Sequence, residues 1–521
     1  MATLSVRTWI DNAASVLSKA WGSVTRQAAA AGCSRQSAYQ HGKRVVQAVT
    51  EAQSGEPARA ELQRQLAEVR AENQQLRERL ESVIEFPVAR QQQFAANAAA
   101  MGLSLQQIYA LLTVVLAVAK CPSRATLGRW VHAAGVAAGR VLQVLDAACQ
   151  QLVHMLCLDE IFFRRQPVLM GVEPHSLTWV MGQRTPDRSG STWCAALLPW
   201  TQVTYVAADG GTGLRSGLNL VQEQRQEAGP ALPLEANLDN FHIQQEGQRS
   251  LRREWQQAES LWSQAEDADH AKAKAQRHGQ DLRHLSQQPK TAWAKAERAF
   301  EAASRREQAW QRAVAALSLF RPDGQLNDRT WATTAIAAAV QELTGPRWAK
   351  TVRMLTDPRS LTFLDRLQRE LQEVVPEQEL QTATLSLWRL RHAAPSDREP
   401  TAAARNRLLI VLQELICQKL DPAGWQVAYQ RVAGVLRGTV RASSVVECMN
   451  SILRMHQARH RTLTQPLIDL KRLYWNCRGF AEGKRRGHCP YEHLGLKLPT
   501  YEWWELLQMG SEDLTQKVSS P

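Results

Sequence analysis

Three acidic residues stand where a carboxylate could do chemistry. Asp159 interrupts the apolar run HMLCLDEIFF, Asp209 follows the run VTYVAA, and Glu447 lies within SSVVECMNSILR. Carboxylates brought together repel one another, and divalent cations with oxygen ligands relieve that repulsion. Two Mg²⁺ ions about 3.5–4 Å apart can activate a water or a 3′-hydroxyl and stabilise the leaving oxygen of a phosphodiester. We therefore predict that the three acids converge on two Mg²⁺ ions, for which Mn²⁺ can substitute.

The direction of each acid depends on the element that carries it. Residues 154–163 alternate as a strand does, so Asp159 and Glu160 project to opposite faces. Glu160 is therefore expected to point away from the site. Singly, each acid is more often structural, which makes their convergence the decisive expectation.

The segment 441–457 is typical of a helix that begins after Ser443 or Ser444. Glu447, Asn450 and Arg454 are spaced to share one face of this helix, beside an apolar face that would anchor it. Glu447 could then project toward the strands, with Asn450 in a supporting position.

Five strand-like runs surround the first two acids. They cover residues 154–163, 167–174, 176–185, 203–209 and 233–243. Three consecutive strands followed by a strand–helix–strand alternation predict a mixed α/β sheet.

The N-terminal residues 1–55 contain a possible DNA-binding unit. Two helices joined by a turn at residues 32–34 fit a helix-turn-helix, and an ordinary helical hairpin is the alternative. The second helix would present four side chains suited to base edges and phosphates, namely Arg35, Gln36, Ser37 and Gln40.

Residues 58–86 carry a heptad pattern. A lone Asn at an a position favours a parallel pair of helices, so the segment predicts a coiled-coil homodimer, with an intramolecular hairpin as the alternative. The seam consists of Leu62, Leu66, Val69, Asn73, Leu76, Leu80 and Val83.

Helical segments make up most of the remaining chain. Residues 90–150 form either a second helix-turn-helix, presenting Arg124 and Arg129, or a connecting helical domain. Residues 248–435 are amphipathic and helical throughout, and residues 501–521 form a polar tail.

Composition indicates an ordinary globular protein with a polyanionic partner. The 521 residues carry a formal net charge of +13, and residues 441–490 hold ten Lys/Arg against three Asp/Glu. No secretory signal is visible, and no apolar run is long enough to span a membrane, so we expect a cytoplasmic protein without membrane attachment.

Nine scattered cysteines suit a reducing compartment. The spacing of Cys477, His488, Cys489 and His493 fits no common zinc pattern.

Several motifs together resemble a known family. LDEIFF, VAADGGTGL, LDNFH, SSVVECMNSILR and YWNCRGFAEGKRRGHCPYEHLGL look like those of a bacterial insertion-sequence transposase of the DDE class, with the resemblance best over residues 154–245 and 441–496. It implies an RNase H-like core in two parts, 151–247 and 436–500, separated by a helical insertion. It also implies that Asp159, Asp209 and Glu447 are the metal-binding triad.

The resemblance extends to Asp239 and His242 in LDNFH. His242 would contact the scissile phosphate or position a metal-bound water. Alternatively, the two side chains hydrogen-bond each other and fix a strand end. Asp239 is also a rival to Asp209 as the second metal ligand.

The predicted function is cleavage and rejoining of DNA at terminal inverted repeats. Two alternatives are a non-catalytic, transposase-derived DNA-binding regulator and a nuclease acting on RNA or hybrids.

Trp193, Trp293 and Trp475 either stack on unpaired bases or belong to the core. Besides Arg454, the predicted phosphate contacts are Lys471, Arg472, Arg478, Lys484, Arg485 and Arg486, although a basic run can also be a solvated face.

Overall fold

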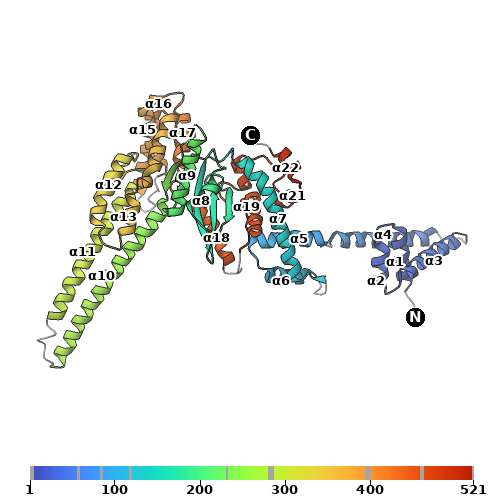
Figure 1. The fold of residues 1–521 in the computed structure, drawn as a ribbon. Helices are drawn as coiled ribbons and strands as arrows, with labels where there is room; N and C mark the ends of the chain where they lie inside the picture. The colour runs from blue at the N-terminus through green and yellow to red at the C-terminus, as the bar shows by residue number, and fades with distance from the viewer. Residues whose placement is uncertain are drawn as a thin grey trace. The chain divides into compact units, whose positions relative to one another are not determined.

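The computed structural model describes residues 5–54, 59–82, 86–116, 120–229, 233–279, 287–392, 400–457 and 463–518. Helices predominate in these ranges, and the strands form one five-stranded sheet (Figure 1). The chain divides into two compact units, residues 1–88 and 89–521.

The first unit is helical. It contains α1 (Val6–Leu17), α2 (Ser23–Ala30), α3 (Arg35–Ser54) and α4 (Arg59–Ser82). Gly32 adopts φ 61° between α2 and α3, and the N–H of Cys33 closes the turn onto the carbonyl of Ala28 at 2.9 Å. Two helices joined by a turn at residues 32–34 are therefore present, because glycine supplies the left-handed residue that ends α2; this turn is compatible with both the helix-turn-helix and the helical hairpin.

The sheet of the second unit confirms the expected mixed topology. It contains β1 (Met155–Phe163), β2 (Gln166–Val172), β3 (Trp179–Arg184), β4 (Tyr205–Ala208) and β5 (Glu235–Leu238), in the order β3-β2-β1-β4-β5. The first three strands are antiparallel, whereas β4 and β5 run parallel to β1. Between them lie α8 (Gly190–Leu197) and α9 (Thr212–Glu227).

One face of the sheet is covered by α18 (Ser444–Gln457) and α19 (Gln465–Cys477). Cys157 and Ile161 of β1 pack in one core with Val446, Met449 and Leu453 of α18. Because alternate residues of a strand share a face, Asp159 lies on the face that α18 covers.

Side chains and helices cover both edges of the sheet. Asn476 of α19 accepts from the N–H of Trp179 at 2.8 Å and donates to its carbonyl at 3.0 Å on edge strand β3. At the other edge, Asn237 of β5 accepts from the N–H of Phe363 at 3.0 Å. Each edge strand is thus contacted by at least one hydrogen bond from another part of the chain.

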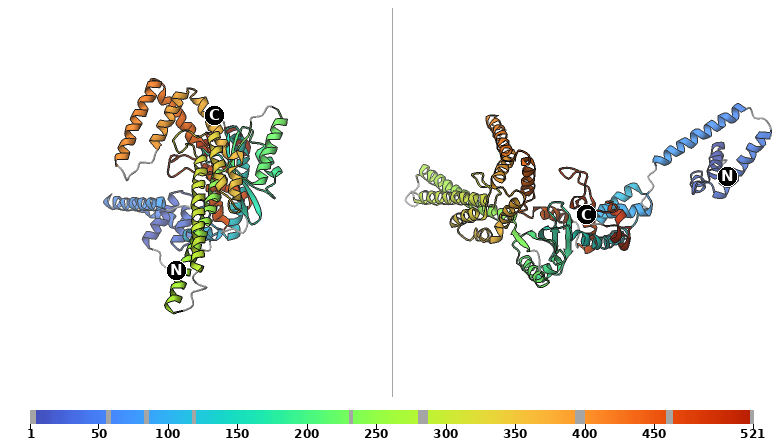
Figure 2. Two further views of the ribbon diagram at one scale, coloured as in Figure 1. Left: turned by 90° about the vertical axis from the view of Figure 1, so that its left-hand side faces the viewer. Right: turned by 90° about the horizontal axis from the view of Figure 1, so that it is seen from above.

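The expected helical insertion is present and contains a long hairpin. Helices α10 (Asn240–Arg277) and α11 (Gln287–Ala316) lie side by side along the hairpin (Figures 1 and 2). The other helical elements are α12 (Arg329–Glu342), α13 (Ala349–Leu355), η2 (Pro358–Leu361), α14 (Thr362–Val374), α15 (Gln378–His392), α16 (Pro400–Leu420) and α17 (Trp425–Gly438).

Three predicted boundaries differ from the structure. The fifth strand ends at Leu238 instead of reaching residue 243, because Asp239 caps α10. The helices α5 (Val88–Met101), α6 (Leu105–Val115) and α7 (Arg124–Cys149) fall in the same compact unit as the sheet, with α7 against α19.

The third difference concerns the C-terminal tail. After the short helix α20 (Pro490–Leu494), the tail forms α21 (Trp503–Leu506) and α22 (Ser511–Lys517), where we expected polar, frayed chain beyond residue 500. Leu506 and Leu514 are buried, so apolar contacts order this segment despite its polar average.

Candidate active site

Asp159 is the buried centre of the candidate site. Only 7% of the residue is exposed, and its Oδ1 accepts from the backbone N–H of Glu160 at 2.8 Å. Burial raises the pKa of its carboxyl to about 7. The charges of Asp209 and Glu447 also raise this pKa, whereas the Glu160 N–H and His242 lower it. The ionised form of Asp159 is therefore disfavoured by burial and by its two acidic neighbours.

Helix α18 brings two of its predicted residues to Asp159. Asn450 is fully buried, and its Nδ2 donates to Asp159 Oδ2 at 2.7 Å. The Oδ1 of Asn450 has no hydrogen-bond partner. Glu447 lies one turn earlier, and its Oε2 is 3.1 Å from the guanidinium of Arg454. The predicted shared face of Glu447, Asn450 and Arg454 is therefore directed at the site.

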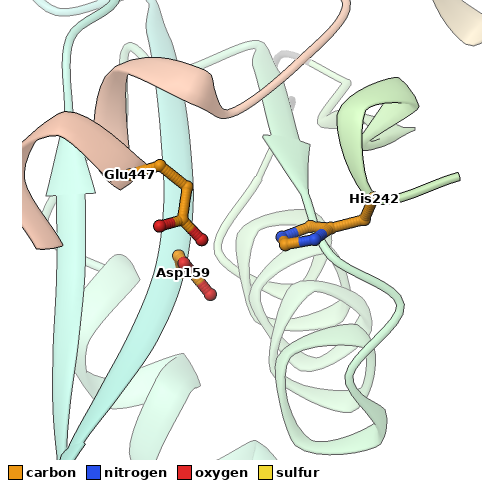
Figure 3. Close-up of side chains that lie close together, drawn as sticks. All are labelled: Asp159, His242 and Glu447. Carbon is orange, nitrogen blue, oxygen red and sulfur yellow. The ribbon is translucent and has the colours of Figure 1, made fainter. Parts of the chain in front are cut away.

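His242 completes a three-residue cluster. It lies in the first turn of α10, whose N-terminus is fixed by Asp239 accepting from the N–H of Phe241 at 2.7 Å. Figure 3 shows the imidazole of His242 and the carboxylates of Asp159 and Glu447 pointing toward one another. One possible ligand atom from each of the three lies within 4.8 Å of the others.

Asp209 lies beside this cluster and is not a member of it. It follows Ala208, which is in parallel register with Leu158, the residue before Asp159. Its Oδ1 accepts from the N–H of Gly211 at 2.9 Å, in the turn that leads to α9. Neighbouring positions on paired parallel strands explain why its charge acts on Asp159.

Asp239 contacts the starts of two helices. Its Oδ1 caps α10, and its Oδ2 accepts a hydrogen bond from the hydroxyl of Ser443. The Oδ2 lies 3.6 Å from His242 Nε2, and the two atoms form no hydrogen bond. Asp239 is fully buried and outside the three-residue cluster; it lies within ion-pair distance of His242, without the hydrogen bond that one of the two alternatives required. Sequence reasoning missed Ser443 as its partner.

Glu160 points away from the cluster, as expected. Its carboxylate pairs with the guanidinium of Arg188, which also lies 5.2 Å from the centre of the Phe162 ring. The adjacent acids of β1 thus serve opposite faces of the sheet.

The three-residue cluster fits a divalent cation. It offers two carboxylates and one imidazole, and hard oxygen donors suit Mg²⁺ or Mn²⁺, while the imidazole also suits softer ions. The buried Oδ1 of Asn450 and Nε2 of His242 lack hydrogen-bond partners, which is consistent with a site built to receive another group. A second ion would require the side chain of Asp209.

The basic residues predicted to contact phosphate divide into two groups. Lys471 and Arg472 are 2% and 7% exposed, so their assignment as phosphate contacts is wrong. The Nζ of Lys471 donates to the carbonyl of Ala100 at 2.8 Å, and Arg472 pairs with Asp146. They face inward because α19 packs against α7 and the end of α5.

The other basic residues of the second unit lie nearer the surface. Arg485 is half-buried and donates to the carbonyl of His175, and Arg454 pairs with Glu447. The exposed side chains are Arg124, Arg129, Arg454, Arg478, Lys484 and Arg486.

In the first unit, Arg35, Gln36 and Gln40 are exposed on α3, and Ser37 is half-buried with its hydroxyl 2.9 Å from that of Ser34. On α4, the seam residues Leu66, Asn73 and Leu76 are exposed. The side chains of Leu62, Leu80 and Val83 lie outside the described residues.

The cysteine, histidine and tryptophan residues considered in the sequence analysis lie as follows. Within the part of the chain that the structure describes, Cys477, His488, Cys489 and His493 do not form a metal-ligand cluster. Trp193 is fully buried and belongs to the core, and the indole N–H groups of Trp293 and Trp475 donate to Asp269 and to the carbonyl of Leu177.

Comparison of the chain with protein-family models, curated proteins and solved structures found no match. Among the helices of the described ranges, none is both long and apolar enough to cross a membrane.

Proposed function

We propose that this chain is a DDE-type DNA transposase that cuts and rejoins strands at the terminal inverted repeats of a mobile element, using Mg²⁺ on an RNase H-like core. The observation that carries the proposal is the convergence of Asp159, His242 and Glu447 from a strand and two distant helices. Chance proximity of these three side chains is improbable, because the long helical insertion separates Glu447 from the other two residues in the sequence.

The arrangement of the sheet supports this core. Asp159 lies on the central strand β1, Asp209 directly follows the neighbouring parallel strand β4, and α18 brings Glu447 over β1. The three acids of the triad therefore come from adjoining elements, and Asp209 remains the proposed second-ion ligand.

Each residue has a defined task in the proposed reaction. When bound, divalent cations supply activation of the attacking hydroxyl and neutralisation of charge on the leaving oxygen. Asn450 and the Glu160 N–H hold the Asp159 oxygens in place, and Arg454 balances the charge of Glu447. The imidazole of His242 orients the scissile phosphate or the attacking water.

DNA recognition is assigned to both units. The exposed face of α3 would read the inverted repeats, and the exposed lysine and arginine side chains of the second unit would bind phosphates. The exposed seam residues of α4, Leu66, Asn73 and Leu76, would pair two copies of the chain.

The test is cleavage of DNA that carries the ends flanking the coding region, in Mg²⁺ or Mn²⁺. Asp159→Asn, Asp209→Asn and Glu447→Gln should each abolish cutting while DNA binding is kept. Asp365→Asn is the matched control, because that carboxylate pairs with Arg329 in the insertion at 2.6 Å. Cutting retained by all three triad variants would refute the mechanism. Salt-sensitive binding with no metal-dependent nicking would instead indicate a regulator, and preference for RNA or hybrids would indicate a nuclease.

A further inference from the structure

The four residues before α18 form an extended segment, 440–443, held to the sheet and to the start of α10; we call it the strap. The carbonyl of Val440 accepts from the hydroxyl of Tyr205 on β4 at 2.6 Å. The carbonyl of Arg441 accepts from the N–H of Asn240 at 3.0 Å. The next carbonyl, of Ala442, lies 3.7 Å from the thiol of Cys157 on β1. Successive backbone groups of the strap are thus attached to β4, α10 and β1.

The strap ends in a buried contact between Ser443 and Asp239. Both residues are fully buried, and the hydroxyl of Ser443 donates to Asp239 Oδ2. The other oxygen of Asp239 accepts from the N–H of Phe241 and begins α10. A single carboxylate therefore joins the starts of two helices, and His242 and Glu447 lie in the first turns of those helices.

The insertion is attached to the same segment. The guanidinium of Arg441 donates to the carbonyl of Leu317, just after α11 ends, at 3.1 Å. Asn237 of β5 donates to the carbonyl of Arg441 at 3.3 Å and accepts from the N–H of Phe363 at the start of α14. The position of α18 is therefore fixed by the sheet and the insertion together.

We propose that Asp239 and Ser443 are a positioning pair, which sets the separation of His242 and Glu447 without touching the metal or the DNA. The geometry of this pair is given by the strap contacts. Its consequence, the assembly of a metal site, rests on the proposed function. A buried carboxylate is costly unless its oxygens accept hydrogen bonds, so Asp239 holds the two helix starts together. Loss of either partner removes this link between the starts of α18 and α10, while the Asn450 contact and the apolar core still hold α18 on β1, so the first turn of α18 and its Glu447 can shift away from His242.

The experiment measures Mn²⁺ binding and amide hydrogen exchange across α18 in the full chain. Ser443→Ala removes the donor and should weaken Mn²⁺ binding roughly 10-fold or more, as loss of groups supporting metal ligands does. It should also speed exchange over residues 447–456. Asp239→Asn keeps one oxygen to accept from the N–H of Phe241, and its amide N–H can donate to the hydroxyl oxygen of Ser443, so it should have a smaller effect than Ser443→Ala.

The matched control is Ser250→Ala, on the same helix as His242. Ser250 is 2% exposed and its hydroxyl donates to the carbonyl of Arg347 at 2.8 Å, away from the strap. It should leave Mn²⁺ binding and α18 exchange unchanged. An equal loss in Ser250→Ala, or wild-type Mn²⁺ binding and exchange in Ser443→Ala, would overturn the proposal.

Two further outcomes separate this inference from the proposed function. If Asp239→Asn eliminates Mn²⁺ binding while Ser443→Ala retains it, Asp239 is a ligand and the positioning role is refuted. If the unaltered chain binds no Mn²⁺, the metal site of the proposed function fails. In that case the exchange measurement still tests whether Ser443 holds α18 in place, because faster exchange in Ser443→Ala depends on the strap contacts and not on a bound metal.

Discussion

Asn450 donates a buried 2.7 Å hydrogen bond to Asp159 Oδ2, and this contact joins two residues that are 291 positions apart. It attaches α18 to the central strand at the point where the candidate site lies. It also fixes the orientation of the Asn450 amide, whose Oδ1 is left without a hydrogen-bond partner.

Replacement of Asn450 should damage both stability and the site. Asn450→Ala removes a buried donor to a carboxylate, which should lower the free energy of unfolding by about 1–3 kcal/mol and weaken Mn²⁺ binding. Asn327→Ala is the control, because Asn327 is equally buried and donates to the carbonyls of Ala316 and Ser318 in the insertion. Urea denaturation and Mn²⁺ titration measure the two effects. Equal Mn²⁺ affinities in both variants would contradict the assignment of Asn450 to the site.

The pKa of Asp159 predicts a pH-dependent stability in metal-free buffer. Its folded-state pKa is raised from 3.8 to about 7, so the stability that protonation provides is complete below pH 3.8 and is lost as pH rises toward 7. The loss corresponds to about 4 kcal/mol, at about 1.4 kcal/mol per pKa unit. Asp159→Asn cannot ionise and should therefore be more stable than the unaltered chain at pH 8, with little difference at pH 4.

The measurement is denaturation of both proteins with a chelator present, at pH 4 and pH 8. Added Mg²⁺ or Mn²⁺ should stabilise the unaltered chain at pH 8 and leave Asp159→Asn unchanged. A difference between the two proteins that does not depend on pH would show that ionisation of Asp159 is not its cause.

Lys471 and Lys484 form a matched pair for DNA binding. Lys484 is exposed, whereas Lys471 is buried and donates to the carbonyl of Ala100. Lys484→Ala should reduce the slope of log affinity against log salt by about 1, and Lys471→Met should leave it unchanged. Titration of fluorescent DNA at several salt concentrations measures both slopes. A reduced slope for Lys471→Met alone would reverse the assignment.

The burial of Lys471 leads to a second prediction for stability, with a pH dependence opposite to that of Asp159. Burial lowers the pKa of the Lys471 ammonium group from 10.5 to about 7. The buried charge therefore lowers the free energy of unfolding by its full amount below pH 7, and this loss disappears as the pH rises toward 10.5. Lys471→Met should raise the free energy of unfolding by about 3 kcal/mol at pH 6, after allowance for the unpaired Ala100 carbonyl. The gain should shrink at pH 10. A constant gain across that range would exclude the charge as its source.

The exposed seam of α4 predicts association of two copies. Leu66 and Leu76 are 52% and 46% exposed, so a charge at either position should prevent pairing. Sedimentation of Leu66→Asp should give monomer at concentrations where the unaltered chain gives dimer. Ala67→Asp places the same charge on an exposed position beside the seam and should preserve the dimer. Dimers in both variants would assign association to another surface.

Local periodicity was sufficient to predict several elements. Alternation along residues 154–163 predicted β1 and the opposite directions of Asp159 and Glu160, because side chains of a strand change face at every residue. The apolar spacing of Val446, Met449 and Leu453 likewise predicted the face on which α18 packs, and hence the direction of Glu447.

The partners of charged side chains required the tertiary structure. Lys471 lies in the apolar helical run PLIDLKRLYW and Lys484 in the glycine-rich basic run GFAEGKRRGH, but both were predicted to contact phosphate; the packing of α19 against α7 buries Lys471, and Lys484 is exposed. Similarly, the sequence left Asp239 as a possible ligand or a partner of His242, and the folded chain assigned its second oxygen to Ser443. Periodicity determines which face of an element is apolar, whereas the identity of a distant partner depends on how those faces dock.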